Sequence, residues 1–250
     1  MKILNLIKKY GEKEVVNNVT LEVPKGKITS FIGPNGAGKS TLLSMLSRLI
    51  QSNHGEIWIG NKEISQWKDN DLARHLSILR QSNHLDIRLT VEELVSFGRF
   101  PHSFGKLNDL DRMKIKQAMQ YMKLTEMKNS FVNELSGGQR QRAFIAMTLA
   151  QDTEHILLDE PLNNLDMKHG VEIMKILRKL ADEMGKTILL VIHDINFASC
   201  YSDHLVAMVN GKVVASGSPN EIIKQEVLQG IYDLDFNIRE VNNKKICVYY

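Results

Sequence analysis

The sequence predicts an α/β fold in which a helical subdomain interrupts a sheet of largely parallel strands. Three observations support this prediction. A glycine-rich turn at 33–38 stands between a strand-like and a helix-like segment. Strand and helix patterns alternate again from 156 to 202, which is typical of parallel pairing. Between these parts, the stretch Thr90–Met127 has a helical pattern rich in Met, Lys and Gln, interrupted by Gly98, Pro101 and Gly105.

The N-terminal part supplies the first strands and the first helix. Apolar strand-like segments precede the glycine-rich turn, and a helix follows it. These elements are predicted at Met1–Lys8, Val15–Val23 and Lys27–Ile32, with the helix at about Lys39–Leu49. Gly55–Gly60 alternates between apolar and polar residues, as a strand with two different faces does.

The later part returns to the same alternation. The predicted elements are a helix at Arg140–Ala150, a buried strand at Ile156–Leu158, an amphipathic helix at Met167–Met184, a strand at Thr187–Ile192 and a helix at Ile195–Ser202. Phe236–Val241 and Ile246–Tyr250, joined at Asn242–Lys245, predict a terminal hairpin. Because no repeat or low-complexity linker marks a cut, we expect one domain over 1–250. Its core comprises 1–81 and 155–225, its helical subdomain 82–154 and its C-terminal tail 226–250.

Composition argues against several classes of function. The chain has 250 residues, 43% of them hydrophobic, and a formal net charge of only +3, without the basic excess of a dedicated nucleic-acid binder. Cys200 and Cys247 lack metal-ligand spacing, which favours structural thiols in a reducing compartment. No segment approaches the roughly 18 apolar residues that span a bilayer. Any membrane association is therefore expected to go through a protein partner.

The strongest chemical signal is the run Gly33, Pro34, Asn35, Gly36, Ala37, Gly38, Lys39, Ser40 and Thr41. Glycines at this spacing let backbone N–H groups turn inward around phosphate oxygens. Lys39 brings a charge to the terminal phosphates, and the Ser40 hydroxyl can bind Mg²⁺. An ordinary glycine-rich turn before a helix is the alternative. The strand before the run and the helix after it favour nucleotide binding.

A second site is predicted where the segment Ile156–Leu158 ends in Asp159 and Glu160. A carboxylate at the end of a buried strand can hold the Mg²⁺ shell, which suits Asp159. Glu160 stands where a general base for an attacking water is needed. Acidic turn residues often end apolar strands, so this signal depends on the phosphate loop beside it. His155 occupies an apolar slot and is expected to mark the strand's edge.

A third signal lies at Leu135, followed by Ser136, Gly137, Gly138 and Gln139. A serine and two glycines before a helix form another anion-ready N-terminus. The alternative is a loop in which Ser136 is only the N-cap.

These three segments, in this order, resemble the ABC ATPase family over most of the chain. The resemblance implies a P-loop NTPase fold, with a RecA-like core of mixed and parallel strands, an N-terminal antiparallel β part and an inserted helical subdomain. It implies ATP hydrolysis with Mg²⁺ by a homodimer. The Ser136–Gln139 signature of one chain would close over ATP held by the phosphate loop of the other.

The resemblance also implies roles that the residues alone do not reveal. Tyr10 resembles the aromatic that stacks on adenine, although a strand tyrosine is often simply exposed. Gln81 resembles the glutamine that touches Mg²⁺ and water and links the site to the helical subdomain; otherwise it would be a solvated side chain. Asp166, in Asn164-Leu165-Asp166, resembles the loop that crosses the dimer interface, although the family often has a small residue at 164. His193 resembles the histidine that senses the γ-phosphate, the alternative being a structural histidine.

A narrower resemblance concerns the transported substrate. Thr90–His102 and Glu160–His169 are similar to ATPases of importers for iron–siderophores, haem and vitamin B12. This implies integral-membrane permease subunits contacted through the helical subdomain, an extracytoplasmic substrate-binding protein, and a place at the cytoplasmic face of the membrane. A ferric siderophore is the favoured cargo; haem, vitamin B12 or another metal chelate remain alternatives, because these segments do not contact the cargo.

Three other classes of protein remain as rivals. A non-transport ABC ATPase generally carries two cassettes or a long coiled-coil insertion, and this chain has neither. A phosphate-loop kinase or GTPase would lack the Ser136–Gln139 signature. A nucleotide-binding regulator without turnover would lack Glu160 or His193.

An apolar segment after Gln81 is a candidate for docking the permease. It contains Leu85, Ile87, Leu89, Phe97, Phe100, Pro101 and Phe104. These side chains either fill the core of the helical subdomain or form the apolar floor of a groove for a permease helix.

Overall fold

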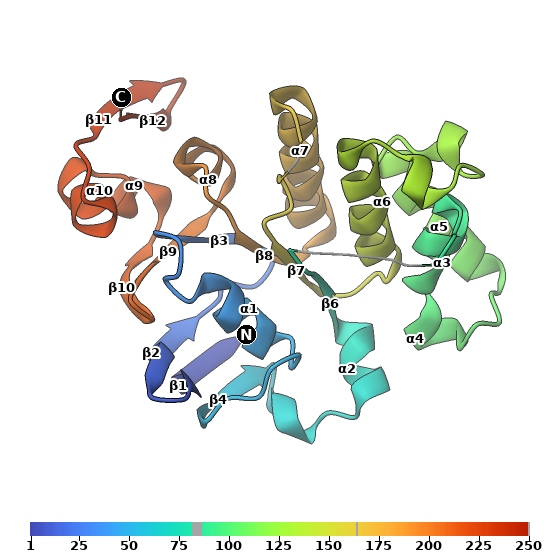
Figure 1. The fold of residues 1–250 in the computed structure, drawn as a ribbon, viewed down its shortest axis with the longest axis horizontal. Helices are drawn as coiled ribbons and strands as arrows, with labels where there is room; N and C mark the ends of the chain where they lie inside the picture. Colours follow the sequence, from blue (N-terminus) through green and yellow to red (C-terminus); the bar gives the residue numbers. More distant parts are fainter. Residues whose placement is uncertain (82–86, 164, 250) are drawn as a thin grey trace. The chain divides into compact units, whose positions relative to one another are not determined.

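The computed structural model describes residues 1–81, 87–163 and 165–249, which form two compact units (Figure 1). The first unit comprises Met1–Trp67 and Leu180–Tyr250, and the second comprises Lys68–Lys179. The subdivision into core and helical subdomain that the sequence predicts at 81/82 and 154/155 stays a prediction.

An antiparallel sheet forms the N-terminal part of the first unit, as predicted. Its order is β2 (Lys13–Glu22), β1 (Lys2–Tyr10), β4 (His54–Ile59) and β5 (Lys62–Glu63). Ile3 and Leu6 of β1 are completely buried, and Val16 and Val19 of β2 are buried with them. The apolar residues on one face of these strands therefore form the core of this part.

A second sheet of the first unit holds the central strand β3 (Ile28–Ile32). It lies between β8 (Thr187–Val191) and β9 (His204–Val209) and is parallel to both, while β10 (Lys212–Gly217) is antiparallel to β9 (Figure 1). Every residue of β3 and β8 is buried. Strands that are buried along their whole length belong to parallel sheets that are covered on both faces.

The helix after β3 is shorter than predicted. α1 spans Lys39–Leu46, whereas the sequence pattern predicts a helix that continues to Leu49. Arg48 takes a left-handed conformation, with φ of 59°. Its guanidinium donates hydrogen bonds to the carbonyls of Ile64 (3.0 Å) and Trp67 (2.6 Å), in and after the 3₁₀ turn Ile64–Gln66. These tertiary bonds turn the chain out of the helix, and Leu49 is left half exposed.

The rest of the first unit consists of short helices and a hairpin. α8 (Ile195–Tyr201), α9 (Pro219–Ile222) and α10 (Gln225–Tyr232) precede the antiparallel pair β11 (Asn237–Val241) and β12 (Lys244–Val248). Asn242 and Asn243 both have positive φ, which a two-residue hairpin turn of type I′ requires. The sequence pattern does not predict α9 or α10.

The second unit holds a parallel strand pair and most of the helices. β6 (Leu76–Leu79) pairs with β7 (His155–Asp159), and α2 (Asp69–His75) precedes β6. β7 is one residue longer at each end than predicted, and the buried His155 is its first residue. The other helices are α3 (Val91–Phe97), α4 (Phe100–Ser103), α5 (Asp109–Tyr121) and α6 (Gly137–Ala150), with 3₁₀ turns at Thr125–Met127 and Val132–Glu134. α7 (Met167–Met184) has the predicted bounds.

A buried ion pair joins the helices of the second unit. α3, α5 and α6 pack on one another (Figure 1), and each begins with a capping box. Arg99 donates to Asp111 (Nε to Oδ1, 2.8 Å) and to the carbonyl of Ala150 at the end of α6 (2.9 Å). Both charged side chains are at most 4% exposed. None of the helices in the described ranges is both long and apolar enough to cross a membrane.

Candidate functional site

The glycine-rich run forms a tight loop between β3 and α1 in the first unit. Gly33 has φ of 134°, and a β-carbon there would lie 2.1 Å from the carbonyl oxygen of Met208. Gly38 has φ of 96°, and its β-carbon would lie 2.3 Å from the carbonyl oxygen of Val15. Any other residue at these two positions would displace the neighbouring main chain. The spacing of these glycines is therefore dictated by the shape of the loop.

Lys39 is held against the main chain of this loop. Its ammonium donates to the carbonyls of Gly33 (2.7 Å) and Pro34 (2.8 Å), and the residue is only 5% exposed. Hydrogen bonds of this kind are what make a buried charge tolerable. Ser40 and Thr41 follow in the first turn of α1 and are half-buried, while Asn35 and Gly36 are exposed. Ala37 is buried, and its carbonyl accepts the N–H of Gly211 (3.1 Å).

The carboxylates predicted after Leu158 lie in the second unit. Asp159 ends β7 and is 6% exposed. Glu160 takes a left-handed conformation, with φ of 51°. Gln81, which follows β6 by two residues, donates its side-chain N–H to Glu160 (2.8 Å). The parallel pairing of β6 and β7 thus brings together two predicted site residues that are 79 positions apart.

Asn163 is a further residue of this cluster that the sequence interpretation missed. Its side-chain amide donates to the same oxygen of Glu160 as Gln81 does, and its main-chain N–H donates to the Glu160 carbonyl (3.2 Å). An asparagine three residues after Glu160, across a proline-containing turn, is the local signal that could have indicated it. The carboxylate of Glu160 is therefore oriented from two sides.

The signature residues form the start of α6 in the second unit. Ser136 is the N-cap: its hydroxyl accepts the Gln139 N–H (3.3 Å), and its N–H donates to the Gln139 side chain (2.9 Å). Ser136 and Gly137 are exposed. Ser136 is therefore the N-cap of α6. This role is compatible with ligand binding, because a hydroxyl that accepts a hydrogen bond from the Gln139 N–H can still donate its own proton to a ligand. The first N–H groups of a helix also point out of its N-terminus, where an anion can accept them.

The remaining predicted residues lie at the ends of secondary-structure elements. Tyr10 ends β1 with its ring 52% exposed and the Lys8 ammonium 5.2 Å from the ring centre. His193 is exposed in the turn between β8 and α8, directly before the N-cap Asp194.

Asp166 precedes α7 and is exposed. It accepts the His169 N–H (2.8 Å) and pairs with the His169 ring (2.8 Å), and the backbone bond is the main reason why the pKa of Asp166 lies below its ordinary value. Asn164, the residue at which the sequence departs from the family pattern, lies outside the described residues.

The phenylalanines after Gln81 lie on the surface rather than in the core. Phe97, Phe100 and Phe104 are 53%, 55% and 63% exposed, and the last two pack edge to face. A mostly apolar groove of about 420 Å³ lies beside α3 and α4, lined by Leu89, Glu93, Ser96, Phe97, Phe100, Ser103, Gly105 and Leu107. Ile87 is exposed and Pro101 half-buried, while Leu85 lies outside the described residues. The core-filling alternative is therefore wrong for the three phenylalanines.

The side chains predicted as metal ligands carry oxygen donors, the kind of ligand that Mg²⁺ prefers in proteins. Within 1–81, 87–163 and 165–249, no three His, Cys, Asp or Glu side chains cluster as a metal-binding group. Mg²⁺ needs no such cluster, because it is usually held by one or two protein oxygens together with nucleotide phosphates and water. The hydroxyl of Ser40, the carboxylate of Asp159 and the amide oxygen of Gln81 are ligands of the right chemistry.

Comparison with known families decides between the rival classes of protein. The sequence profile of the family described as ABC transporter matches residues 16–163, more than half of the chain. The chain belongs to the ABC transporter family. The matched part contains the glycine-rich run 33–41, the segment 135–139, and both Asp159 and Glu160.

Individual relatives agree with this assignment over nearly the whole chain. The petrobactin import ATP-binding protein YclP of Bacillus subtilis (strain 168) is 55% identical over 250 residues, covering 100% of this chain and 99% of the relative. The ferric enterobactin transport ATP-binding protein FepC of Escherichia coli (strain K12) is 43% identical over 227 residues, covering 90% and 84%. The dimeric structure of a bacterial ABC transporter cassette superposes with a TM-score of 0.79 at 32% identity, covering 87% of this chain and 98% of that one.

The predicted fold class and activity are thereby confirmed. This chain has the ABC ATPase fold and is an ATP-binding, ATP-hydrolysing transport subunit. A phosphate-loop kinase or GTPase is excluded by family membership.

Proposed function

We propose that this chain powers the import of a ferric siderophore across the cytoplasmic membrane. The supporting observation is its similarity, over its full length, to petrobactin import ATP-binding proteins. Besides YclP, these include FatE of Bacillus anthracis, which is 47% identical over 249 residues and covers 100% of both chains. The cargo meets the permease and the binding protein rather than the ATPase. Haem, vitamin B12 and other metal chelates are therefore the outcomes against which the test is designed.

The phosphate loop is proposed to hold ATP through main-chain N–H groups and the Lys39 ammonium, while Tyr10 stacks on adenine. Mg²⁺ is the proposed cofactor, with oxygens of Ser40, Gln81 and Asp159 as candidate ligands. When bound, it supplies positive charge to the β- and γ-phosphates. Holding the ammonium against the Gly33 and Pro34 carbonyls keeps the charge of Lys39 in one place before nucleotide arrives.

Glu160 is proposed as the general base that takes a proton from the attacking water. The amides of Gln81 and Asn163 both donate to one of its oxygens, which holds that oxygen in place. Gln81 then has two roles, because it orients the base and also belongs to the candidate Mg²⁺ ligands. His193 is proposed to sense the γ-phosphate.

A homodimer is the proposed working form. The helix start at Ser136–Gln139 of one chain would cover the ATP held by the phosphate loop of the other, with Asp166 at the interface. ATP makes these contacts only in the closed dimer, so its binding shifts the population toward closure and its hydrolysis reverses the shift.

The groove of the second unit is proposed to receive a cytoplasmic helix of the permease. Its apolar floor of Leu89, Phe97 and Phe100, with the polar Glu93 and Ser96 at the side, suits an amphipathic helix. Through this contact the chain would work at the cytoplasmic face of the membrane, in a complex that also contains an extracytoplasmic substrate-binding protein.

Uptake measurements in a strain lacking this chain test the proposed cargo. Cells are offered radiolabelled iron bound to a catecholate siderophore, a hydroxamate siderophore, petrobactin or haem, and, in a separate assay, radiolabelled vitamin B12. We expect the strain to lose uptake of one ferric siderophore. The wild-type chain should restore this uptake, and so should the control variant Glu126→Gln, which changes an exposed carboxylate in the same unit as Glu160. Glu160→Gln should not restore it. If uptake of every ferric siderophore is normal and uptake of haem or another chelate is lost, the cargo is that chelate and the proposal of a ferric siderophore is wrong.

A further inference from the structure

The first residue of the phosphate loop is bonded to the C-terminal part of the chain. The N–H of Gly33 donates to the hydroxyl of Tyr232, at 2.9 Å and across 199 residues of sequence. Tyr232 is the last residue of α10 and lies outside the segment 16–163 that matches the family profile. No sequence motif could predict this contact, because no pattern in the sequence links Gly33 with Tyr232.

This hydrogen bond leads directly to the charged residue of the loop. While the Gly33 N–H is held by Tyr232, the Gly33 carbonyl accepts the Lys39 ammonium at 2.7 Å. The position of the Lys39 charge therefore depends on Gly33, and the position of Gly33 depends on the Tyr232 hydroxyl. The short approach of Gly33 to the main chain at Met208 limits its movement on another side.

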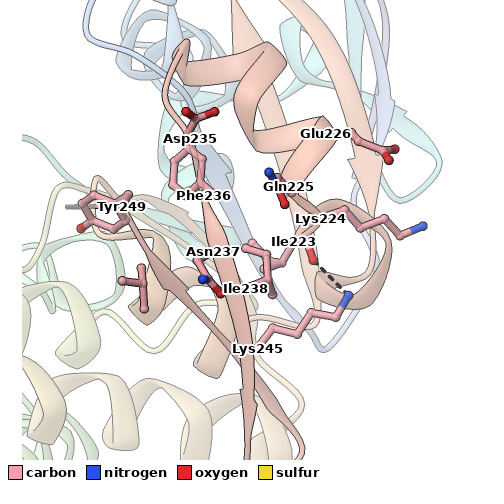
Figure 2. Close-up of a pocket in the computed structure, with 11 residues that line it drawn as sticks. Ile223, Lys224, Gln225, Glu226, Asp235, Phe236, Asn237, Ile238, Lys245 and Tyr249 are labelled. Atoms are coloured by element: carbon pink, nitrogen blue, oxygen red, sulfur yellow. Dashed lines mark hydrogen bonds between the residues drawn. The ribbon is translucent and has the colours of Figure 1, made fainter.

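Tyr232 is itself held by aromatic packing. Its ring lies 5.9 Å from that of Phe236, and Phe236 lies 5.5 Å from Tyr249. Phe236 is only 3% exposed, and Figure 2 shows Phe236 and Tyr249 at a cavity of about 1080 Å³ between α10 and the terminal hairpin. Burial raises the pKa of Tyr232 to about 12, so the phenol accepts as a neutral group throughout the physiological range.

The hairpin that carries Tyr249 is anchored in turn on α8. The Asn196 side chain exchanges two hydrogen bonds with the main chain of Cys247 (3.2 and 2.7 Å), and the Ser199 hydroxyl donates to the carbonyl of Lys245 (2.6 Å). The Lys245 ammonium donates hydrogen bonds to the carbonyls of Asn220 and Ile223, and Figure 2 draws the bond to Ile223. The segment 225–249 is thus a continuous support from α8 to the phosphate loop.

We propose that Tyr232 is a positioning residue for the ATP phosphate loop: its hydroxyl fixes Gly33 and, through the Gly33 carbonyl, the ammonium of Lys39. The proposal rests on the assignment of 33–41 as the ATP phosphate loop. It makes the C-terminal tail part of the machinery that sets ATP affinity, rather than an appendage to it.

Tyr232→Phe tests this proposal, because it removes the hydroxyl and keeps the ring. The matched control is Tyr121→Phe, which removes a phenol oxygen that accepts a side-chain amide in α5 of the other unit (3.2 Å). With Mg²⁺ present, the Kd of a fluorescent ATP analogue and the KM for ATP should rise about two- to tenfold in Tyr232→Phe, the range that one net hydrogen bond corresponds to. The kcat at saturating ATP should fall less than KM rises. Tyr121→Phe should leave Kd and KM unchanged.

Hydrogen exchange of the Gly33 amide gives a readout that does not need turnover. It should accelerate in Tyr232→Phe and keep the wild-type rate in Tyr121→Phe. A second variant, Phe236→Leu, retains the Tyr232 hydroxyl but removes the ring packed on Tyr232. It should raise the Kd for the ATP analogue, as Tyr232→Phe does. It also serves if Tyr232→Phe fails to fold.

The outcomes separate this proposal from the assignment on which it rests. If Lys39→Ala binds ATP normally, the loop assignment itself is wrong. If Lys39→Ala loses binding while Tyr232→Phe and Phe236→Leu bind like the wild type, only the positioning role is overturned. An equal loss in Tyr232→Phe and Tyr121→Phe would also overturn it, because the effect would then be one of general stability.

Discussion

Glu160 combines a strained backbone with an oriented side chain. A positive φ costs a residue with a β-carbon about 1 kcal/mol or more, and it persists only where the surroundings hold it. Here the buried strand β7 precedes Glu160, and the side-chain amides of Gln81 and Asn163 donate hydrogen bonds to its carboxylate. The left-handed turn directs the side chain away from the course of the strand. Arg48, Asp152 and Asp233 also have positive φ, so it is the strain together with the two amide contacts that distinguishes Glu160.

Glu160→Gln is expected to bind ATP and Mg²⁺ but to lower kcat by about 10²- to 10⁴-fold, since an amide cannot accept the proton of water. The glutamine oxygen can still accept from Gln81 and Asn163, so folding should be preserved. ATPase rates and the size of the ATP-bound species on size-exclusion chromatography measure both effects. Wild-type turnover would mean that another residue is the base, and Glu126→Gln serves as the neutral control.

At the scale of the elements, the helices of the second unit depend on one buried charge pair. Arg99 connects Asp111 near the start of α5 with the carbonyl that ends α6. Burial by itself would raise the pKa of Asp111. The Asn108 N–H and the Arg99 guanidinium outweigh it, so the pKa of Asp111 lies below its ordinary value. The helix that carries the signature is thus fixed at its far end by a charge.

Asp111→Asn is expected to reduce the free energy of unfolding by about 3 kcal/mol, because removing one partner of a buried pair leaves the other charge uncompensated. Lys114→Met is the matched control. It breaks the Lys114–Asp152 pair (2.7 Å), which lies in the same unit but is partly exposed, and should cost less than about 1 kcal/mol. Urea denaturation at neutral pH measures both. Equal losses of unfolding free energy in the two variants would show that the buried Arg99–Asp111 pair contributes no more to stability than a partly exposed pair.

The same pair predicts a dependence on pH. Because the folded pKa of Asp111 is lowered, its contribution is complete above the unfolded value, about 3.9, and is lost as the pH falls toward the folded value. The stability difference between wild type and Asp111→Asn should therefore be constant from pH 7 to pH 5 and shrink below pH 4, roughly where the carboxyl begins to titrate. Urea midpoints across this range measure it. A difference that grew on acidification would contradict the assigned direction.

At the scale of the whole molecule, the exposed phenylalanines offer a test of whether transport can be separated from hydrolysis. Phe100→Glu places a charge in the groove of the second unit, while Leu110→Glu places one on an equally exposed apolar residue of α5 outside the groove lining. We expect both variants to keep wild-type stability and ATPase rate. Only Phe100→Glu should abolish uptake and co-purification with the permease. Unchanged uptake would show that the permease docks elsewhere.

The proposed dimer makes a separate prediction for mixed chains. Ser136→Arg should block closure over the partner's ATP, and Lys39→Ala should abolish binding in its own loop. A mixed dimer has one composite site with both lesions and one with neither, so it should show more ATPase activity than either variant alone. If assembly of the mixed dimer is intact and activity is absent, either the two sites must act together or the cross-subunit arrangement is wrong. Crosslinking Ser136 to the partner loop distinguishes these cases.

Local features of this protein were determined by the sequence itself. The glycines of 33–38 follow from the positive φ of their turn, the capping boxes of α3, α5 and α6 from residues three apart, and the bounds of α7 from its apolar period. All of these depend on interactions within about one turn of the chain, so neighbouring residues are sufficient to predict them.

Only the tertiary structure decided the features that depend on distant partners. Arg48 ends α1 early because the carbonyls that hold it lie 16 and 19 residues further on. Gln81 meets Glu160 because β6 and β7 pair, and the exposure of Phe100 depends on which helices surround it. Tyr232 reaches Gly33 only after the whole first unit has packed. Hydrophobic burial brings such groups together without regard to their separation in sequence, and so no local pattern records which donor will meet which acceptor.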